Sequence, residues 1–171
     1  MRVLEQRMTD YKAPDGTQLG HINLRVSDIE RSIAFYRDLL GFHLMGQYPG
    51  QAAFLSSSGY YHHFALSQAE PGATLVKGLG LDHIAINYPT RRDLAAVTQR
   101  LIEAGWPIKG TVDYLTHDCV YTSDPDGIGL ELAWDRDREE WPWSDGVIAW
   151  GSRPLPLDDL LTELDPAPAT T

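Results

Sequence analysis

The chain reads Leu19-Gly20-His21-Ile22-Asn23-Leu24-Arg25-Val26 and, further on, Leu81-Asp82-His83-Ile84-Ala85-Ile86-Asn87. In both stretches apolar and polar residues alternate, which is typical of a strand with one buried face. His21 and His83 occupy equivalent places, 62 residues apart. The chain therefore contains an internal repeat, which we interpret as two tandem modules of nearly equal size.

Each of these strands is followed by the sequence pattern of a helix. The capping boxes Ser27-Asp28-Ile29-Glu30 and Thr90-Arg91-Arg92-Asp93 open them, and glycines 64 residues apart, Gly41 and Gly105, end them. We therefore predict helices over Asp28–Leu40 and Arg91–Ala104. Period-two patterns then predict further strands, at 42–48, 52–57 and 60–68 in the first module and at 109–115, 118–123 and 127–135 in the second.

The predicted fold class is α+β, with two tandem βαβββ modules. A four-stranded sheet covered by one helix leaves its other face open, so we expect the two open faces to enclose a shared cavity, with the helices outside. The predicted parts are an N-terminal extension (1–18), the first module (19–70), a linker (71–80), the second module (81–135) and a C-terminal arm (136–171). A short helix is predicted within this arm, at Leu157–Leu164.

Composition narrows the class of partner. The 171 residues include 24 acidic and 14 basic side chains, a net charge of −10, which argues against binding nucleic acid or an anionic membrane. The single cysteine, Cys119, excludes an internal disulfide framework and a zinc site built from several cysteines. The sequence has no apolar run of about 20 residues, the length of a membrane span. We therefore expect a cytoplasmic protein whose partner is a small molecule or another protein.

Three residues have the chemistry of a metal site. His21 and His83 begin equivalent strands, and Glu131 lies in the last predicted strand between Leu130 and Leu132. A carboxylate that faces a protein interior without a partner costs several kcal/mol, and a metal ion removes that cost. Two imidazoles and one carboxylate form the facial triad of non-haem Fe(II) oxygenases. A histidine in an amphipathic strand is more often a hydrogen-bonded or surface residue, and we keep that interpretation for His43 and His117.

From Leu19 to Asp159 the chain resembles the vicinal oxygen chelate superfamily, and within it the short type I extradiol dioxygenases. The resemblance is carried by the two histidine-containing strands and by six further segments. It implies Fe(II), or alternatively Mn(II), held by His21, His83 and Glu131, and a homo-oligomer. The further segments are Ala34-Phe35-Tyr36-Arg37-Asp38-Leu39-Leu40-Gly41-Phe42, His62-His63-Phe64-Ala65-Leu66, Tyr121-Thr122-Ser123-Asp124-Pro125-Asp126-Gly127, Gly129-Leu130-Glu131-Leu132, Asp137-Arg138-Glu139-Glu140-Trp141-Pro142 and Pro154-Leu155-Pro156-Leu157-Asp158.

The resemblance also implies residues that act on the substrate. A histidine in the last strand of the first module serves such enzymes as an acid or base, and the alignment favours His62, although a slip of one residue gives His63. Strand alternation sends these two to opposite faces. Tyr121 matches a tyrosine that hydrogen-bonds a substrate oxygen. Seven residues earlier the family usually has a histidine, whereas this sequence has Tyr114. We judge His117 to be on the wrong strand face to replace it.

The resemblance thus implies extradiol ring cleavage of a catechol-type aromatic diol with O₂. Two alternatives remain open: a module that sequesters a ligand without metal chemistry, and a glyoxalase-type lyase or isomerase that depends on a metal. The substitution at Tyr114 favours the first alternative, whereas the three metal-binding side chains argue against it. Candidates for an apolar wall around the substrate ring are Phe54, Phe64 and Trp134.

Overall fold

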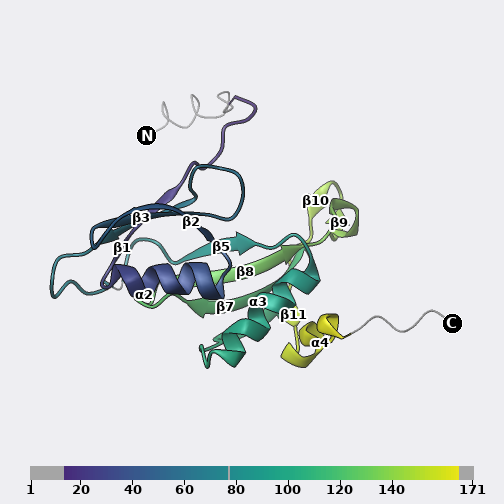
Figure 1. Ribbon diagram of the computed structural model, residues 1–171. Coiled ribbons are helices and arrows are strands. Elements are labelled where there is room, and N and C mark those ends of the chain that lie inside the picture. Colours follow the sequence, from purple (N-terminus) through teal and green to yellow (C-terminus); the bar gives the residue numbers. More distant parts are fainter. Residues whose placement is uncertain (1–13, 77, 166–171) are drawn as a thin grey trace.

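The computed structural model describes residues 14–76 and 78–165. Most of the predicted N-terminal extension and the last six residues of the arm lie outside this part. Two mixed sheets and their helices make up the fold, so the α+β class with two βαβββ modules is confirmed (Figure 1). Within the described residues, no helix has the length and apolar character needed to cross a bilayer.

The first sheet has the strand order β1-β4-β3-β2. β1 runs parallel to β4, and the other neighbours are antiparallel. Ala53 and Leu55 point into the core, so Phe54 between them lies on the opposite, open face. The strands are β1 (Ile22–Val26), β2 (His43–Tyr48), β3 (Ala52–Ser56) and β4 (Phe64–Gln68).

The second sheet repeats this arrangement and adds one strand, in the order β11-β6-β7-β8-β5. Again the first strand of the module, β5, runs parallel to the last, β8. Leu130 and Leu132 are buried in the core, so the residues between them face the open side of the sheet. The strands are β5 (His83–Asn87), β6 (Gly110–Asp113), β7 (His117–Ser123), β8 (Gly129–Asp135) and β11 (Arg153–Pro154).

Both predicted helices are present. α2 (Ile29–Ala34) continues as a π-helical turn, η1 (Phe35–Leu39), and α3 (Arg91–Glu103) covers the second sheet. Gly41 and Gly105 follow them at φ +82° and +67°, values that glycine adopts without strain. The N-cap of α3 is Thr90, as predicted, but that of α2 is Asp28. The predicted Ser27 cap is wrong because its hydroxyl bonds the second module instead.

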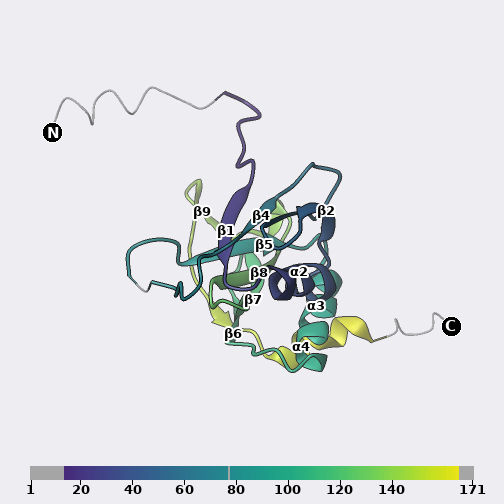
Figure 2. The same cartoon turned by 60° about the vertical axis from the view of Figure 1, so that its left-hand side comes forward.

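The helices of the two modules pack against each other. The rings of Phe35 and Trp106, which follow α2 and α3, are 4.8 Å apart, and the Tyr88 hydroxyl donates to the Leu40 carbonyl at 3.3 Å. Both views place α2 beside α3 (Figures 1 and 2). This differs from the expected arrangement, with helices outside and an enclosed cavity. The reason is that the apolar helix faces and the core faces of both sheets form one hydrophobic core.

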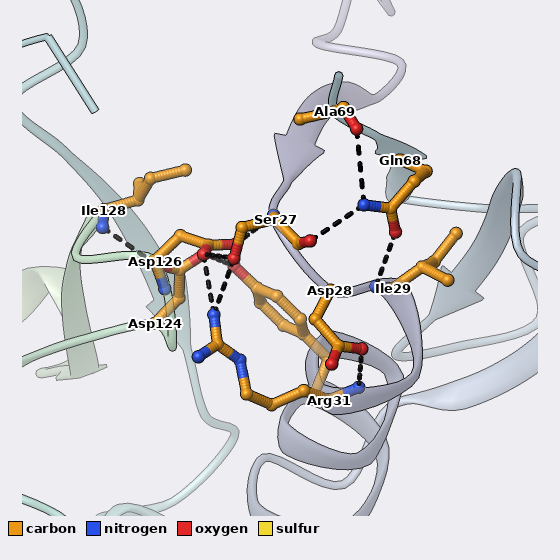
Figure 3. A network of polar contacts seen from close by, with 10 residues as sticks. Ser27, Asp28, Ile29, Arg31, Gln68, Ala69, Asp124, Asp126 and Ile128 are labelled. Atoms are coloured by element: carbon orange, nitrogen blue, oxygen red, sulfur yellow. Dashed lines mark hydrogen bonds and ion pairs between the residues drawn. The ribbon is translucent and has the colours of Figure 1, made fainter. Parts of the chain in front are cut away.

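The turn before β8 joins the two modules (Figure 3). The Asp126 carboxylate accepts the backbone N–H of Ser27 at 2.9 Å and pairs with Arg31 at 2.7 Å. The buried Asp124 accepts the Tyr36 hydroxyl at 3.3 Å and two backbone N–H groups of its own turn. Burial raises the pKa of Tyr36 and of Asp124 above their ordinary values. These contacts fix the start of α2 against the second module.

The C-terminal arm is more ordered than its sequence pattern predicts. β11 pairs with β6 as a fifth strand, and the helix predicted at Leu157–Leu164 forms as α4 (Leu157–Leu161) and η3 (Thr162–Leu164). Between β8 and β11 lie η2 (Arg138–Glu140), β9 (Trp143–Ser144) and β10 (Val147–Ile148).

A buried ion network ties this arm to the second module. Asp118 is 1% exposed and accepts from Arg136 at 2.6 Å and from Arg91 at 2.8 Å. Arg91 also binds Glu163 of η3 at 2.6 Å. Loss of Asp118 would leave Arg91 with Glu163 and Arg136 with Asp113, and would take from both arginines their most buried partner.

We expect Asp118→Ala to lower the free energy of unfolding by about 3–5 kcal/mol, because Arg91 and Arg136 lose their shared carboxylate. Urea denaturation followed by circular dichroism measures this loss. The matched control is Asp38→Ala, which removes an exposed carboxylate paired with Arg37 at 2.6 Å and should change the unfolding free energy little. Equal effects of the two substitutions would contradict the role assigned to the network.

Candidate metal centre

Glu131 is the centre of a polar cluster on the open face of the second sheet. It is 8% exposed and lies opposite Tyr121 on β7 and Ala85 on β5. Its two oxygens face different imidazoles: His83 Nε2 is 3.2 Å from Oε2, and His117 Nε2 is 3.2 Å from Oε1. Ligand atoms that share one metal ion at about 2.0–2.2 Å are separated by similar distances. Each imidazole and the carboxylate oxygen that it faces therefore have the spacing of two ligands of one divalent cation.

His83 is oriented by its neighbour. Its Nδ1 is 2.7 Å from the Asp82 carboxylate and its Nε2 faces Glu131. A proton on Nδ1 would bond Asp82 and leave the Nε2 lone pair for a metal ion. Metal-binding histidines usually bind a carboxylate or carbonyl in this way through their other nitrogen. Local sequence thus supplies both the imidazole and the group that directs it.

Two phenols extend the cluster. The Tyr121 hydroxyl donates to Glu131 Oε2 at 2.8 Å, and the Tyr114 oxygen is 3.3 Å from that of Tyr121. Since Tyr121 has a single proton, it accepts from Tyr114. Burial, together with the hydrogen bonds to Tyr114 and Glu131, raises the pKa of Tyr121. Tyr121 is thus held in its protonated form as a hydrogen-bond donor to Glu131.

His117 is the residue that sequence reasoning missed. Tyr114 and His117 have opposite parity in the sequence, but the turn between β6 and β7 lies between them. In this turn Leu115 has φ +68°, and Tyr114 N–H donates to the His117 carbonyl at 2.9 Å. The two rings stack 5.0 Å apart on the same face. The signal that could have found His117 was its even spacing from Tyr121 on the same strand.

The open face of the first sheet holds a second group. The His62 ring is 4.6 Å from that of His21 and 5.2 Å from that of Phe54. Burial, with smaller effects from His21 and His63, lowers the pKa of His62. His63 points elsewhere, with Nδ1 3.1 Å from the hydroxyl of the buried Ser56. Of the two histidines left open by the sequence, His62 is the one that shares a face with His21.

The structure brings together some of the expected site residues. His83, Glu131, Tyr121 and Tyr114 form one group, and His21 and His62 form another. We looked among the described residues for three or more His, Cys, Asp or Glu side chains whose ligand atoms lie within 4.8 Å of one another. One such set is present, and His21 does not belong to it. That set is His117, Cys119 and Glu131. A single chain therefore does not assemble the predicted set of three ligands.

The expected apolar wall is represented by Phe54. Phe64 is buried among Tyr36 and Phe42 in the core, and Trp134 packs against the same core with Arg136 over its ring. The expectation for Phe64 and Trp134 is wrong because both point to the helix-covered side of their sheets.

Comparison with known proteins identifies the family. The family model of the Glyoxalase/Bleomycin resistance protein/Dioxygenase superfamily matches residues 18–132. The chain belongs to this superfamily. Among solved structures of members, a glyoxalase/dioxygenase from Nostoc punctiforme has a TM-score of 0.61 at 21% identity and covers 75% of this chain and 99% of its own. The lactoylglutathione lyase of Agrobacterium tumefaciens has a TM-score of 0.56 at 20% identity, with 72% and 96% covered.

Curated relatives in the superfamily are enzymes of different activities. Catechol-2,3-dioxygenase of Bacillus subtilis (strain 168) is 39% identical over 117 residues, which are 64% of this chain and 40% of that protein. Biphenyl-2,3-diol 1,2-dioxygenase 3 of Rhodococcus globerulus is 30% identical over 69% of this chain and 63% of its own length. Lactoylglutathione lyase of Haemophilus influenzae is 30% identical, with 67% and 90% covered. The chain thus spans less than two thirds of these two dioxygenases.

Proposed function

We propose that the protein is an Fe(II)-dependent extradiol dioxygenase that cleaves a catechol-type aromatic diol with O₂. The observation that carries this proposal is the placement of His83 Nε2 3.2 Å from the buried Glu131 carboxylate, with Asp82 behind the imidazole and Tyr121 beside the carboxylate. One imidazole and one carboxylate are two of the three ligands of the facial triad. The identity to catechol-2,3-dioxygenase of Bacillus subtilis supports the same reaction class.

We infer that the third ligand, His21, comes from a second copy of the chain. His21 is exposed on the open face of the first sheet, and the His83 side chain is 37% exposed on that of the second. Each face thus carries an incomplete ligand set. A two-fold dimer that joins the first sheet of one copy to the second sheet of the other completes two sites. It also encloses both open faces, as the sequence leads us to expect within one chain.

When bound, iron(II) supplies the redox-active centre between an aromatic diol and O₂, a role for which Mn(II) is the alternative. The chain's own residues position the diol and move protons. Tyr121 and Tyr114 offer phenol donors next to Glu131, where a diol oxygen would be bound. His62 has a lowered pKa, so its neutral imidazole is available to take a proton from the diol and to return it to the product. Phe54 gives an apolar surface beside it.

A pair of mixed dimers tests the site and the reaction together. In the first dimer, one copy carries His21→Ala and the other His83→Ala. In the second dimer, one copy carries both substitutions and the other none. Two affinity tags isolate each dimer, and iron content and O₂ uptake with a panel of catechols are measured.

If the sites lie between copies, we expect the first dimer to keep one of two sites, about half of the wild-type iron and activity, and the second dimer to keep none. The reverse result would place each site within one chain. Iron binding without O₂ uptake would contradict the dioxygenase reaction. Isomerisation of a glutathione hemithioacetal in that case would favour the lyase activity of the relative in Haemophilus influenzae.

A further inference from the structure

Cys119 is a buried thiol that the proposed reaction does not use. It is 0% exposed. Residues 117, 119 and 121 of β7 point to the same side of the sheet, so Cys119 lies between His117 and Tyr121 on the open face. In the pairing with β8 it lies opposite Ala133, two pairs along from the pair of Tyr121 and Glu131. The thiol is thus directed toward the polar cluster.

The ligand atoms of His117, Cys119 and Glu131 lie within 4.8 Å of one another. His117 Nε2 approaches Glu131 Oε1, the oxygen that faces away from His83. We propose that these three residues form a second cation site, with a ligand set distinct from His21 and His83, and that it takes a divalent cation of the zinc class. The two sites share only the Glu131 carboxylate, through different oxygens.

The choice of cation follows from the donors. A thiolate, an imidazole and a carboxylate are ligands of Zn²⁺ and Co²⁺, and the soft sulfur favours these ions over Mn²⁺ or Mg²⁺. Three protein ligands leave a fourth tetrahedral position for water or another small donor. The His117 side chain is 21% exposed, which provides access from the open face. The proposal rests on these side-chain positions and not on the proposed dioxygenase reaction.

Cobalt(II) is the probe, because a thiolate ligand gives Co²⁺ a charge-transfer band in the near ultraviolet that nitrogen and oxygen ligands do not give. Cys119 is the only cysteine in the sequence, so such a band in the anaerobic full-length protein has one possible source. We expect the wild-type protein to show the band and His83→Ala to retain it. His117→Gln should weaken cobalt binding by more than about tenfold, since the loss of a group that merely supports a ligand already costs that much.

Cys119→Ser is expected to abolish the band while iron binding at His83 is retained. His43→Gln, which alters an exposed histidine of β2, is the matched control and should leave the band unchanged. The wild-type spectrum decides the proposal even if Cys119→Ser does not fold. Cobalt bound with no thiolate band, or no bound cobalt at all, would overturn it. Loss of the band in His83→Ala would show that sulfur belongs to the His83 site and would also contradict it.

Discussion

His83→Ala is expected to remove iron retention and turnover together. The substitution deletes the imidazole whose Nε2 lies 3.2 Å from Glu131 and leaves Asp82 without its partner. We expect the affinity for Fe(II) to fall by more than about 100-fold, because loss of a group that only supports a metal ligand already costs 10- to 100-fold. Anaerobic iron titration and O₂ uptake with a panel of catechols measure the two effects.

The control is His43→Ala, which removes an exposed histidine from β2 of the first sheet. It should retain wild-type iron affinity and turnover. Turnover that survives in His83→Ala, or iron affinity that falls equally in the control, would remove His83 from the metal centre. Circular dichroism of both variants separates loss of the metal from loss of the fold.

His62→Gln is expected to reduce turnover by roughly 10²- to 10⁴-fold, the usual contribution of a positioned acid or base. Iron content should remain at the wild-type level, because His62 is not one of the proposed ligands and its ring packs beside that of His21. The loss should appear in kcat rather than in KM, since glutamine keeps a polar group of similar size beside Phe54. The acidic limb of the pH–rate profile, where a neutral His62 becomes protonated, should disappear with it.

His63→Gln tests the neighbouring position. His63 is directed toward the buried Ser56, so its substitution should affect stability more than turnover. If the acidic limb of the pH–rate profile disappeared in His63→Gln and remained in His62→Gln, the proton-transfer role would belong to His63 and not to His62. A rise in KM with unchanged kcat would instead assign His62 to substrate binding.

Local pattern was sufficient for the secondary structure of the two modules. Period-two alternation predicted the strands of both modules, and the two glycines with positive φ end helices where the sequence indicates. The cap of α2 was misjudged by one residue, since Ser27 and Asp28 are both good caps. The Ser27 hydroxyl donates to Asp126 instead, so Asp28 caps the helix. Asp126 lies 99 residues from Ser27, so this contact is not visible in the local sequence.

Local pattern also accounts for one contact of the candidate site, that between Tyr121 and Glu131. Tyr121 and Glu131 are ten residues apart on adjacent antiparallel strands, and a hairpin brings such residues directly opposite each other. Asp82 and His83 are neighbours in the chain. His117 was missed because side chains alternate between the two faces of a sheet only within one strand. The turn between β6 and β7 breaks this alternation, so Tyr114 and His117 face the same side.

The sequence by itself determined the repeat, the strand and helix pattern of each module, and the open sheet faces that carry histidine and glutamate. Only the tertiary structure decided how the modules face each other. The alternation of apolar and polar residues shows which face of a sheet is apolar. It does not show which helices will pack on that face. In the folded chain α2 and α3 pack together, so His21 and Glu131 stay on separate open faces. This arrangement follows from the burial of apolar surfaces of both modules, which are far apart in sequence, in one hydrophobic core.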